Sequence, residues 1–151
     1  MSPNPILVLH SVMRWLVVVF ALWALARAYA GWAGRRPWTA VDRRSGLLFS
    51  ILLDLQVLIG LLVYFFVDAD TSPFQAGLLA NPAGRYFTWF HALPMLIALV
   101  LAHIGSSRAR KAVDDVTKHR TAAVFYTLSI LVILLAIPWP FTPFGAPWLR
   151  L

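Results

Sequence analysis

The stretch at residues 86–105 limits the fold of this chain more than any other stretch, because it is apolar and long enough to cross a bilayer as a helix. A helix rises about 1.5 Å per residue and needs about 20 residues to cross the hydrocarbon core. His91 and His103 lie in this stretch, about 18 Å apart along a helix axis. Pro94 removes a backbone donor one turn after His91, so we expect a local bend there. The stretch predicts a membrane helix with one imidazole toward each face.

The composition supports the same class of protein. Of 151 residues, 60% are hydrophobic and 13% are charged, whereas a soluble domain usually has about a quarter of its residues charged. Cysteine is absent, which excludes disulfides, iron–sulfur ligation, thiolate chemistry and c-type haem attachment. The composition predicts an integral membrane protein, with residues 1–151 forming a single domain.

Four apolar runs predict four membrane spans, at residues 5–28, 46–67, 86–105 and 121–137. A Pro/Gly/Asn-rich loop is expected at 68–84, and polar loops at 29–45 and 106–120. The first run is too long for an ordinary signal peptide and lacks a positively charged start, so we expect it to be retained as a span. The predicted fold is all-α, a four-helix transmembrane bundle.

The basic residues predict its orientation. Ten lysines and arginines flank the first and third loops, against two on the opposite side. By the positive-inside rule, both termini should lie on the outer (periplasmic) side of a bacterial inner membrane. Basic clusters between apolar spans more often orient a membrane protein and contact anionic lipid than bind nucleic acid, so we expect no nucleic-acid partner.

Two histidines form the main candidate site. Counting inward from the outer boundary, His10 and His91 lie at matching depths of about 8 and 9 Å on different helices. Neutral imidazole is a usual haem ligand, and helical bundles build cofactor sites from facing helices. We therefore expect both to be axial ligands of a b-type haem. Three alternatives stay open: interfacial histidines bonded to loop carbonyls or water, another metal, or proton transfer. Zinc or copper would need further ligands, and the chain has no cysteine or glutamate to supply them.

Other polar residues share the same membrane depth. Arg14 lies one turn from His10, and Asp54 matches the depth of Arg14 within one turn. We expect Arg14 and Asp54 to form a buried ion pair, helped by Gln56. Alternatively, Arg14 binds a haem propionate or a quinone oxygen and Asp54 belongs to a proton path. His103 and His119 could hold a second haem on the inner side, but the basic surroundings of His119 favour a solvated or lipid-facing side chain.

Several segments carry a family resemblance: LHSVMRW, GWAGRRPWTAVDRRSG, DLQVLIGLLVYF, FHALPMLIALVLAHIGSSRARKAVDD, KHR and IPWPF. Together they resemble a family of small four-helix bacterial membrane proteins labelled cytochrome-b-like. The matching positions are His10, Arg14, Asp54, Gln56, His91 and the run Lys118-His119-Arg120. Family members often have glutamate where this chain has Phe90 and histidine where it has Asp54, and the place of His103 is commonly not histidine.

The combined interpretation is a membrane-embedded b-type haem protein taking part in electron transfer, with His10 and His91 as ligands and Arg14 beside them. Expected partners are the lipid bilayer and a quinone or the subunits of a larger membrane complex. A different class is also open: a cofactor-free accessory subunit of a respiratory or photosynthetic complex. A third is a small proton-coupled transporter using Asp54 and His103.

Overall fold

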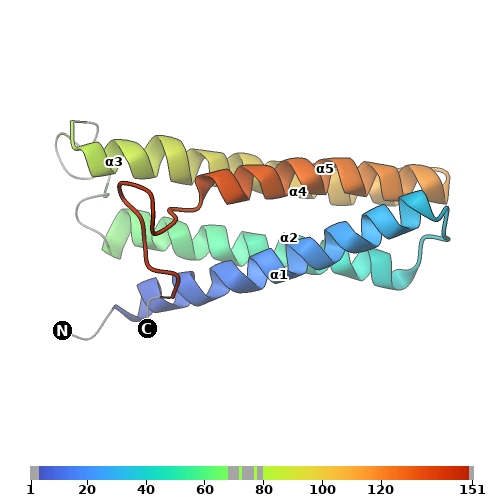
Figure 1. The fold of residues 1–151 in the computed structure, drawn as a ribbon, viewed down its shortest axis with the longest axis horizontal. Helices are drawn as coiled ribbons and strands as arrows, with labels where there is room; N and C mark the ends of the chain where they lie inside the picture. Colours follow the sequence, from blue (N-terminus) through green and yellow to red (C-terminus); the bar gives the residue numbers. More distant parts are fainter. Residues whose placement is uncertain (1–3, 68–71, 73–76, 78–79, 150–151) are drawn as a thin grey trace.

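The computed structural model describes residues 4–67, 72, 77 and 80–149, and every regular element in these residues is helical. Four long helices lie side by side (Figure 1). Each is long and apolar enough to cross a membrane: Pro5–Ala33, Ala40–Val67, Pro82–Lys111 and Asp115–Ala136. The predicted all-α bundle of four transmembrane helices is thereby confirmed.

The two ends of the chain lie at the same end of the bundle, called the outer end below, and the two basic loops lie at the other, inner end (Figure 1). This arrangement follows from an even number of long helices joined by short connections. Which side of a membrane each end faces stays a prediction from the basic residues.

The helices extend beyond the apolar runs that predicted them. They are α1 (Pro5–Ala33), α2 (Ala40–Leu62) with the π-helical turn η1 (Val63–Val67), α3 (Pro82–Tyr86), η3 (Phe87–Ala92), α4 (Leu93–Lys111) and α5 (Asp115–Ala136). Polar residues at the inner end continue the helices past the expected hydrocarbon boundary, because local caps rather than apolar character decide where a helix begins. Most of the loop predicted at 68–84 lies outside the described residues.

Polar caps begin the helices. The side chain of Asn4 accepts a hydrogen bond from the Ile6 amide, with Pro5 at the first helical position. Asp114 caps α5 by accepting from the Thr117 amide at 2.8 Å. That backbone hydrogen bond favours the carboxylate and holds the pKa of Asp114 below its ordinary value. These caps satisfy amides that a helix leaves without intrahelical partners.

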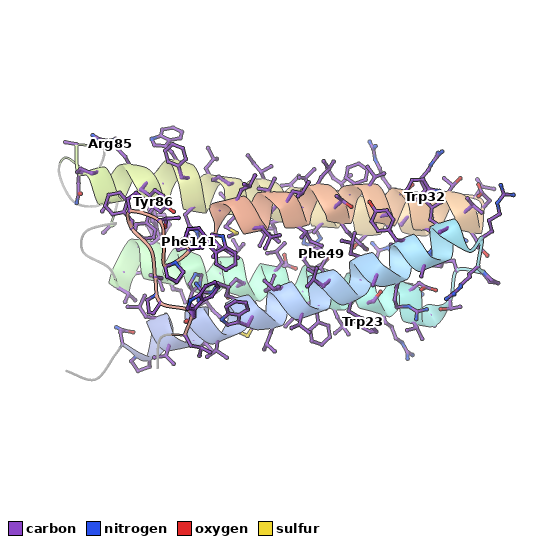
Figure 2. The ribbon with its side chains drawn as sticks, viewed as in Figure 1. Trp23, Trp32, Phe49, Arg85, Tyr86 and Phe141 are labelled. Atoms are coloured by element: carbon purple, nitrogen blue, oxygen red, sulfur yellow. The ribbon has the colours of Figure 1, made fainter. Side chains whose placement is uncertain are left out.

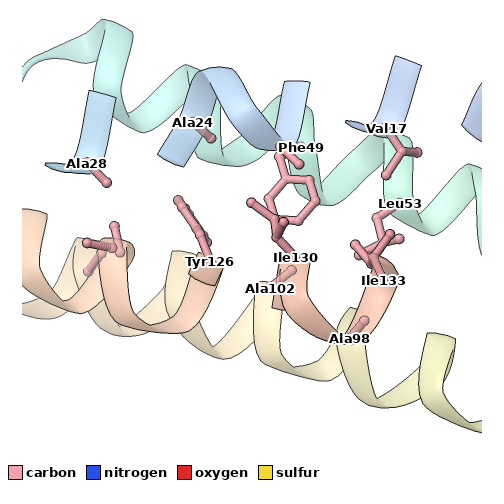
Figure 3. Close-up of a cluster of buried hydrophobic side chains, with 14 of the residues drawn as sticks. Val17, Ala24, Ala28, Phe49, Leu53, Ala98, Ala102, Tyr126, Ile130 and Ile133 are labelled. Atoms are coloured by element: carbon pink, nitrogen blue, oxygen red, sulfur yellow. The ribbon is translucent and has the colours of Figure 1, made fainter. Parts of the chain in front are cut away.

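The centre of the bundle is built largely from alanine with a few large side chains. Phe49 and Leu53 of α2 are fully buried, and Phe49 meets Tyr126 of α5 edge to face at 5.6 Å (Figure 3). The buried alanines are Ala21, Ala24, Ala28, Ala98, Ala102, Ala109, Ala122, Ala123 and Ala136. Small side chains let membrane helices approach closely, and dispersion contacts then hold them together. Large aliphatic side chains instead cover the outer surface, as a lipid-facing surface requires.

A chain of hydroxyl groups crosses the inner half of this core. Ser106 of α4 bonds both Ser50 of α2 and the Tyr126 hydroxyl of α5, each at 3.0 Å. Gly46 leaves the space that the tyrosine hydroxyl fills, since a Cβ there would overlap it. A buried hydroxyl without a partner would be costly, so these mutual bonds fix the relative placement of three helices.

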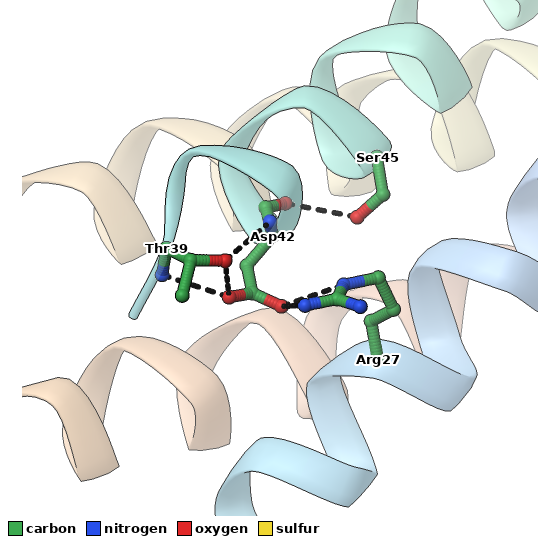
Figure 4. Close-up of polar contacts among 4 residues, drawn as sticks. All are labelled: Arg27, Thr39, Asp42 and Ser45. Atoms are coloured by element: carbon green, nitrogen blue, oxygen red, sulfur yellow. Dashed lines mark hydrogen bonds and ion pairs between the residues drawn. The ribbon is translucent and has the colours of Figure 1, made fainter. Parts of the chain in front are cut away.

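An ion pair at the inner end joins α1 to α2 (Figure 4). The guanidinium of Arg27 donates to one oxygen of Asp42 through Nε at 2.8 Å and Nη2 at 2.7 Å. The other oxygen of Asp42 accepts from the backbone amide and hydroxyl of Thr39, which forms a capping box at the start of α2. One carboxylate thus caps a helix and holds the end of its neighbour.

After α5 the chain turns back over the outer end of the bundle and reaches α1 (Figure 1). Arg14 Nη2 donates to the carbonyls of Pro147 at 3.1 Å and Trp148 at 2.7 Å, and Trp15 Nε1 donates to Trp148 at 2.8 Å. The indole of Trp139 packs against Trp15 and Trp148. Residues 137–149, called the C-terminal segment below, therefore close this end of the bundle.

Candidate cofactor site

A cavity of about 160 Å³ lies inside the outer half of the bundle, between all four long helices and the C-terminal segment. Its wall is mostly apolar. The polar side chains that line it are His10, Ser11, Arg14, Gln56, Tyr64 and His91. An apolar cavity with a few converging polar groups is the usual form of a small-molecule or cofactor site.

The two histidines predicted to share a site meet in this cavity. The ring centres of His10 and His91 are 6.2 Å apart, and the ring planes are nearly perpendicular, at 82°. His10 comes from α1 and His91 from the π-helical turn η3, so the site joins the first and third spans. The expected proximity of these two side chains is therefore observed, whereas their depth in a membrane stays a prediction. Their role as haem ligands stays a prediction.

The position of His91 follows from Pro94. Proline has no amide hydrogen to continue the α-helical pattern, and the helix here takes a π-helical turn in which the Leu93 amide bonds the Thr88 carbonyl. This turn carries His91 toward α5, where its Nδ1 donates to the Ala136 carbonyl at 2.8 Å. Since a neutral imidazole has one N–H, the lone pair then lies on Nε2. The same bond occurs in histidines that ligate metals through Nε2 and in purely structural ones.

His10 is held from α2. Gln56 Nε2 donates to the His10 carbonyl at 3.0 Å and lies 3.3 Å from the imidazole Nε2. Gly60, one turn further, provides the surface under the ring, because a Cβ there would lie 3.0 Å from Cε1 of His10. The expectation that Gln56 helps to satisfy the guanidinium of Arg14 is therefore wrong.

The other amide atom of Gln56 is unusual. Its Oε1 is buried and has no hydrogen-bond partner among the described residues. A buried acceptor of this kind costs about 1–3 kcal/mol if it stays unsatisfied. The residue itself lines the cavity, so a shift of its amide would bring this acceptor within reach of a polar group there.

Aromatic side chains close the outer mouth of the cavity. Figure 2 shows Tyr86 and Phe141 at the end of the bundle that the C-terminal segment crosses. Tyr86 packs on Phe144 at 5.2 Å between ring centres, and Phe144 is part of the cavity wall. The ring of Phe87 also meets that of His91 at 6.0 Å. The C-terminal segment thus forms part of the cavity wall at this end.

The predicted ion pair between Arg14 and Asp54 is wrong. Arg14 reaches carbonyls of the C-terminal segment, and Asp54 Oδ1 bonds His103 Nε2 at 2.8 Å. The two residues have similar depths but lie on different sides of the bundle. Asp54 faces α4, whereas Gln56, two residues further and about 200° around the helix, faces the cavity.

The inner pair of His103 and His119 does not form either. His103 lies with Asp54, while His119 is buried to 1% exposure and packs edge-on to Trp38 with ring centres 4.8 Å apart. Gly31 leaves the space for this imidazole, since a Cβ there would overlap the ring. The expectation that His119 is solvated or lipid-facing is therefore wrong. No pattern in the sequence predicts that Gly31 and Trp38 would enclose His119.

Within the described residues, no group of three or more histidine, cysteine, aspartate or glutamate side chains is arranged to hold a metal ion. A haem iron takes four ligands from its own porphyrin, so two histidines suffice for that group. Comparison of the chain with protein-family models, curated proteins and solved structures found no match in any of the three.

Proposed function

We propose that this protein is a membrane-embedded b-type haem protein that takes part in electron transfer, with His10 and His91 as the axial ligands. The observation that carries the proposal is the placement of their two rings in one apolar cavity, 6.2 Å apart and at 82°.

This separation suits two imidazoles that bind one metal ion from opposite sides. Metal–imidazole bonds of about 2.0 Å would place the two ring centres roughly 6 Å apart. Each ring can rotate about its own bond, so perpendicular planes are compatible with such ligation. The bond from His91 Nδ1 to Ala136 supports it further, because it directs the Nε2 lone pair away from that carbonyl.

The rest of the cavity fits the chemistry of haem. Its apolar wall suits a porphyrin face, and the guanidinium of Arg14 at its edge suits a propionate. A porphyrin is larger than the cavity of about 160 Å³, so binding would require the bundle to widen at this point. The Gln56 amide would leave His10 Nε2, and Phe144 and the C-terminal segment would move outward. Bound haem supplies reversible one-electron oxidation and reduction of its iron. The chain's own residues would hold the iron, exclude water and balance the propionate charge.

The proposed setting is a bacterial inner membrane with both termini outside. The outer end would then face the periplasm, and electrons would be exchanged with a quinone or with the subunits of a larger respiratory or photosynthetic complex. The basic inner loops support this orientation.

Absorption spectra test the proposal. Protein produced with ample haem should show, after reduction, the sharp bands of a low-spin six-coordinate b-type haem. His10→Ala and His91→Ala should each make the haem high-spin or release it. His103→Ala is the matched control, because this exposed histidine lies outside the cavity and its loss should leave the spectrum unchanged. Colourless wild-type protein would overturn the proposal.

A further inference from the structure

The hydrogen-bonded pair of Asp54 and His103 lies on the outside of the bundle. The two side chains are 39% and 51% exposed, and neither lines the cofactor cavity. The second oxygen of Asp54 and Nδ1 of His103 make no hydrogen bond within the described part of the chain. Each residue therefore has one bonded polar atom and one without a hydrogen bond in the described part of the chain.

The depth of this pair makes its exposure unfavourable in a lipid environment. Asp54 is the middle residue of the 28-residue span Ala40–Val67, so it lies about 20 Å from either end of the helix. Ionisable groups at such depths face a bundle interior or another protein surface, because lipid offers them no hydrogen bonds. Some polar surface must therefore cover this pair.

Apolar side chains surround the pair on both helices. Leu58 of α2 follows Asp54 by four residues and Val100 of α4 precedes His103 by three, so each lies about one turn toward the outer end. Ile51 lies one turn toward the inner end. All three are exposed. Together with Asp54 and His103 they form what we call the α2–α4 face, a polar centre within an apolar border.

We propose that the α2–α4 face is the contact between two copies of this chain, related by a two-fold axis along the membrane normal. The argument is charge complementarity. Such an axis preserves depth and places α2 of one copy opposite α4 of the other, so each Asp54 meets the partner subunit's His103. In this contact each imidazole carries a proton on both nitrogens: Nε2 donates to Asp54 of its own copy, and Nδ1 donates to the second carboxylate oxygen of Asp54 in the other copy. Four side chains then close a hydrogen-bonded ring.

The orientation of the chain supports a second copy as the occupant. Both copies carry the same basic loops and insert the same way around, which a two-fold axis along the membrane normal requires. The contact leaves the C-terminal segment and the cofactor cavity at the other side of α2 untouched, so the inference stands independently of haem binding.

Cross-linking between copies tests the proposal, and the absence of cysteine from the chain removes any background. One copy carries Leu58→Cys, and a differently tagged copy carries Val100→Cys. After co-expression in membranes, a short bis-maleimide should join the two tags. Val19→Cys with Val100→Cys is the matched control, because Val19 is equally exposed but lies on α1. Equal yields in both combinations, or a cross-link only to another protein, would overturn the proposal.

A second measurement separates the polar contact from simple proximity. Native mass measurement of the protein in lipid nanodiscs should give a dimer for the wild type. The double variant Asp54→Leu with His103→Leu should weaken association at least tenfold, whereas the exchange Asp54→His with His103→Asp should retain it. Helical circular dichroism checks that each variant is folded. A monomeric wild type, or an exchange variant that behaves like the leucine variant, would contradict the proposed ring.

Discussion

The imidazole of His10 rests on the backbone of Gly60, where a Cβ atom would lie only 3.0 Å from Cε1 of the ring. The glycine thus gives α2 a flat surface that carries a side chain of α1. With Gln56 one turn before it, Gly60 determines where His10 can lie relative to His91.

Gly60→Leu should displace the His10 ring and reduce the haem content of the purified protein to less than a tenth of the wild-type ratio. Overpacking of this kind also destabilises by about 1–3 kcal/mol. Gly60→Ala should have a smaller effect on both, because the ring needs to move only a few tenths of an ångström. Haem-to-protein absorbance ratios and thermal unfolding measure the two effects. Full haem content in the Gly60→Leu variant would show that haem binding does not depend on the position of the His10 ring.

Gly31 and His119 should be energetically coupled. Gly31→Ala places a methyl group where the imidazole lies and should destabilise the protein by about 1–3 kcal/mol. In a His119→Ala background the same change should cost close to nothing, because the overlap has been removed. A double-mutant cycle in mild detergent measures the interaction free energy. Equal costs of Gly31→Ala in both backgrounds would contradict the observed packing.

Arg14 and Asp54 should behave as independent sites. Their bonding partners are different, so the effects of Arg14→Met and Asp54→Leu on stability should add within about 0.5 kcal/mol. Thermal unfolding of the two single variants and the double variant measures this. A coupling free energy above about 1 kcal/mol would mean that the two charges interact directly after all.

Reporter fusions check the orientation. A reporter after residue 112, in the short connection between α4 and α5, should read cytoplasmic because of the neighbouring basic residues. A reporter at the C-terminus should read external, since one further span intervenes. The opposite pair of readings would reverse the orientation and place the cofactor cavity near the cytoplasm.

The sequence was informative about the lengths of the helices and the positions of residues along them. It said much less about which side of its helix each residue occupies. Counting residues placed His10 level with His91, and the two rings do meet. The same counting placed Arg14 level with Asp54, yet they diverge, because depth does not say which side of a helix a residue occupies. The spacing of Asp54 and Gln56 was informative. Two residues apart on a helix, they point about 200° away from each other, so Asp54 cannot face α1 when Gln56 contacts His10.

Sequence patterns could not predict the contacts that irregular backbone makes. The C-terminal segment contains prolines that prevent a helix, so its carbonyls need donors from elsewhere. The spacing of residues does not predict that Arg14 and Trp15 are those donors. The enclosure of His119 had the same origin, since it depends on how the loop around Trp38 folds back onto α5.

The bond between Arg14 and the Trp148 carbonyl joins positions 134 residues apart. Arg14 lies in the first of the four long helices and Trp148 follows the last of them, so this contact can form only after all four helices have been synthesised. Covering of the cavity by the C-terminal segment therefore comes after synthesis of the helices that form its wall. A ligand that enters before the contact forms meets a more open cavity, and one that arrives later must first displace the C-terminal segment.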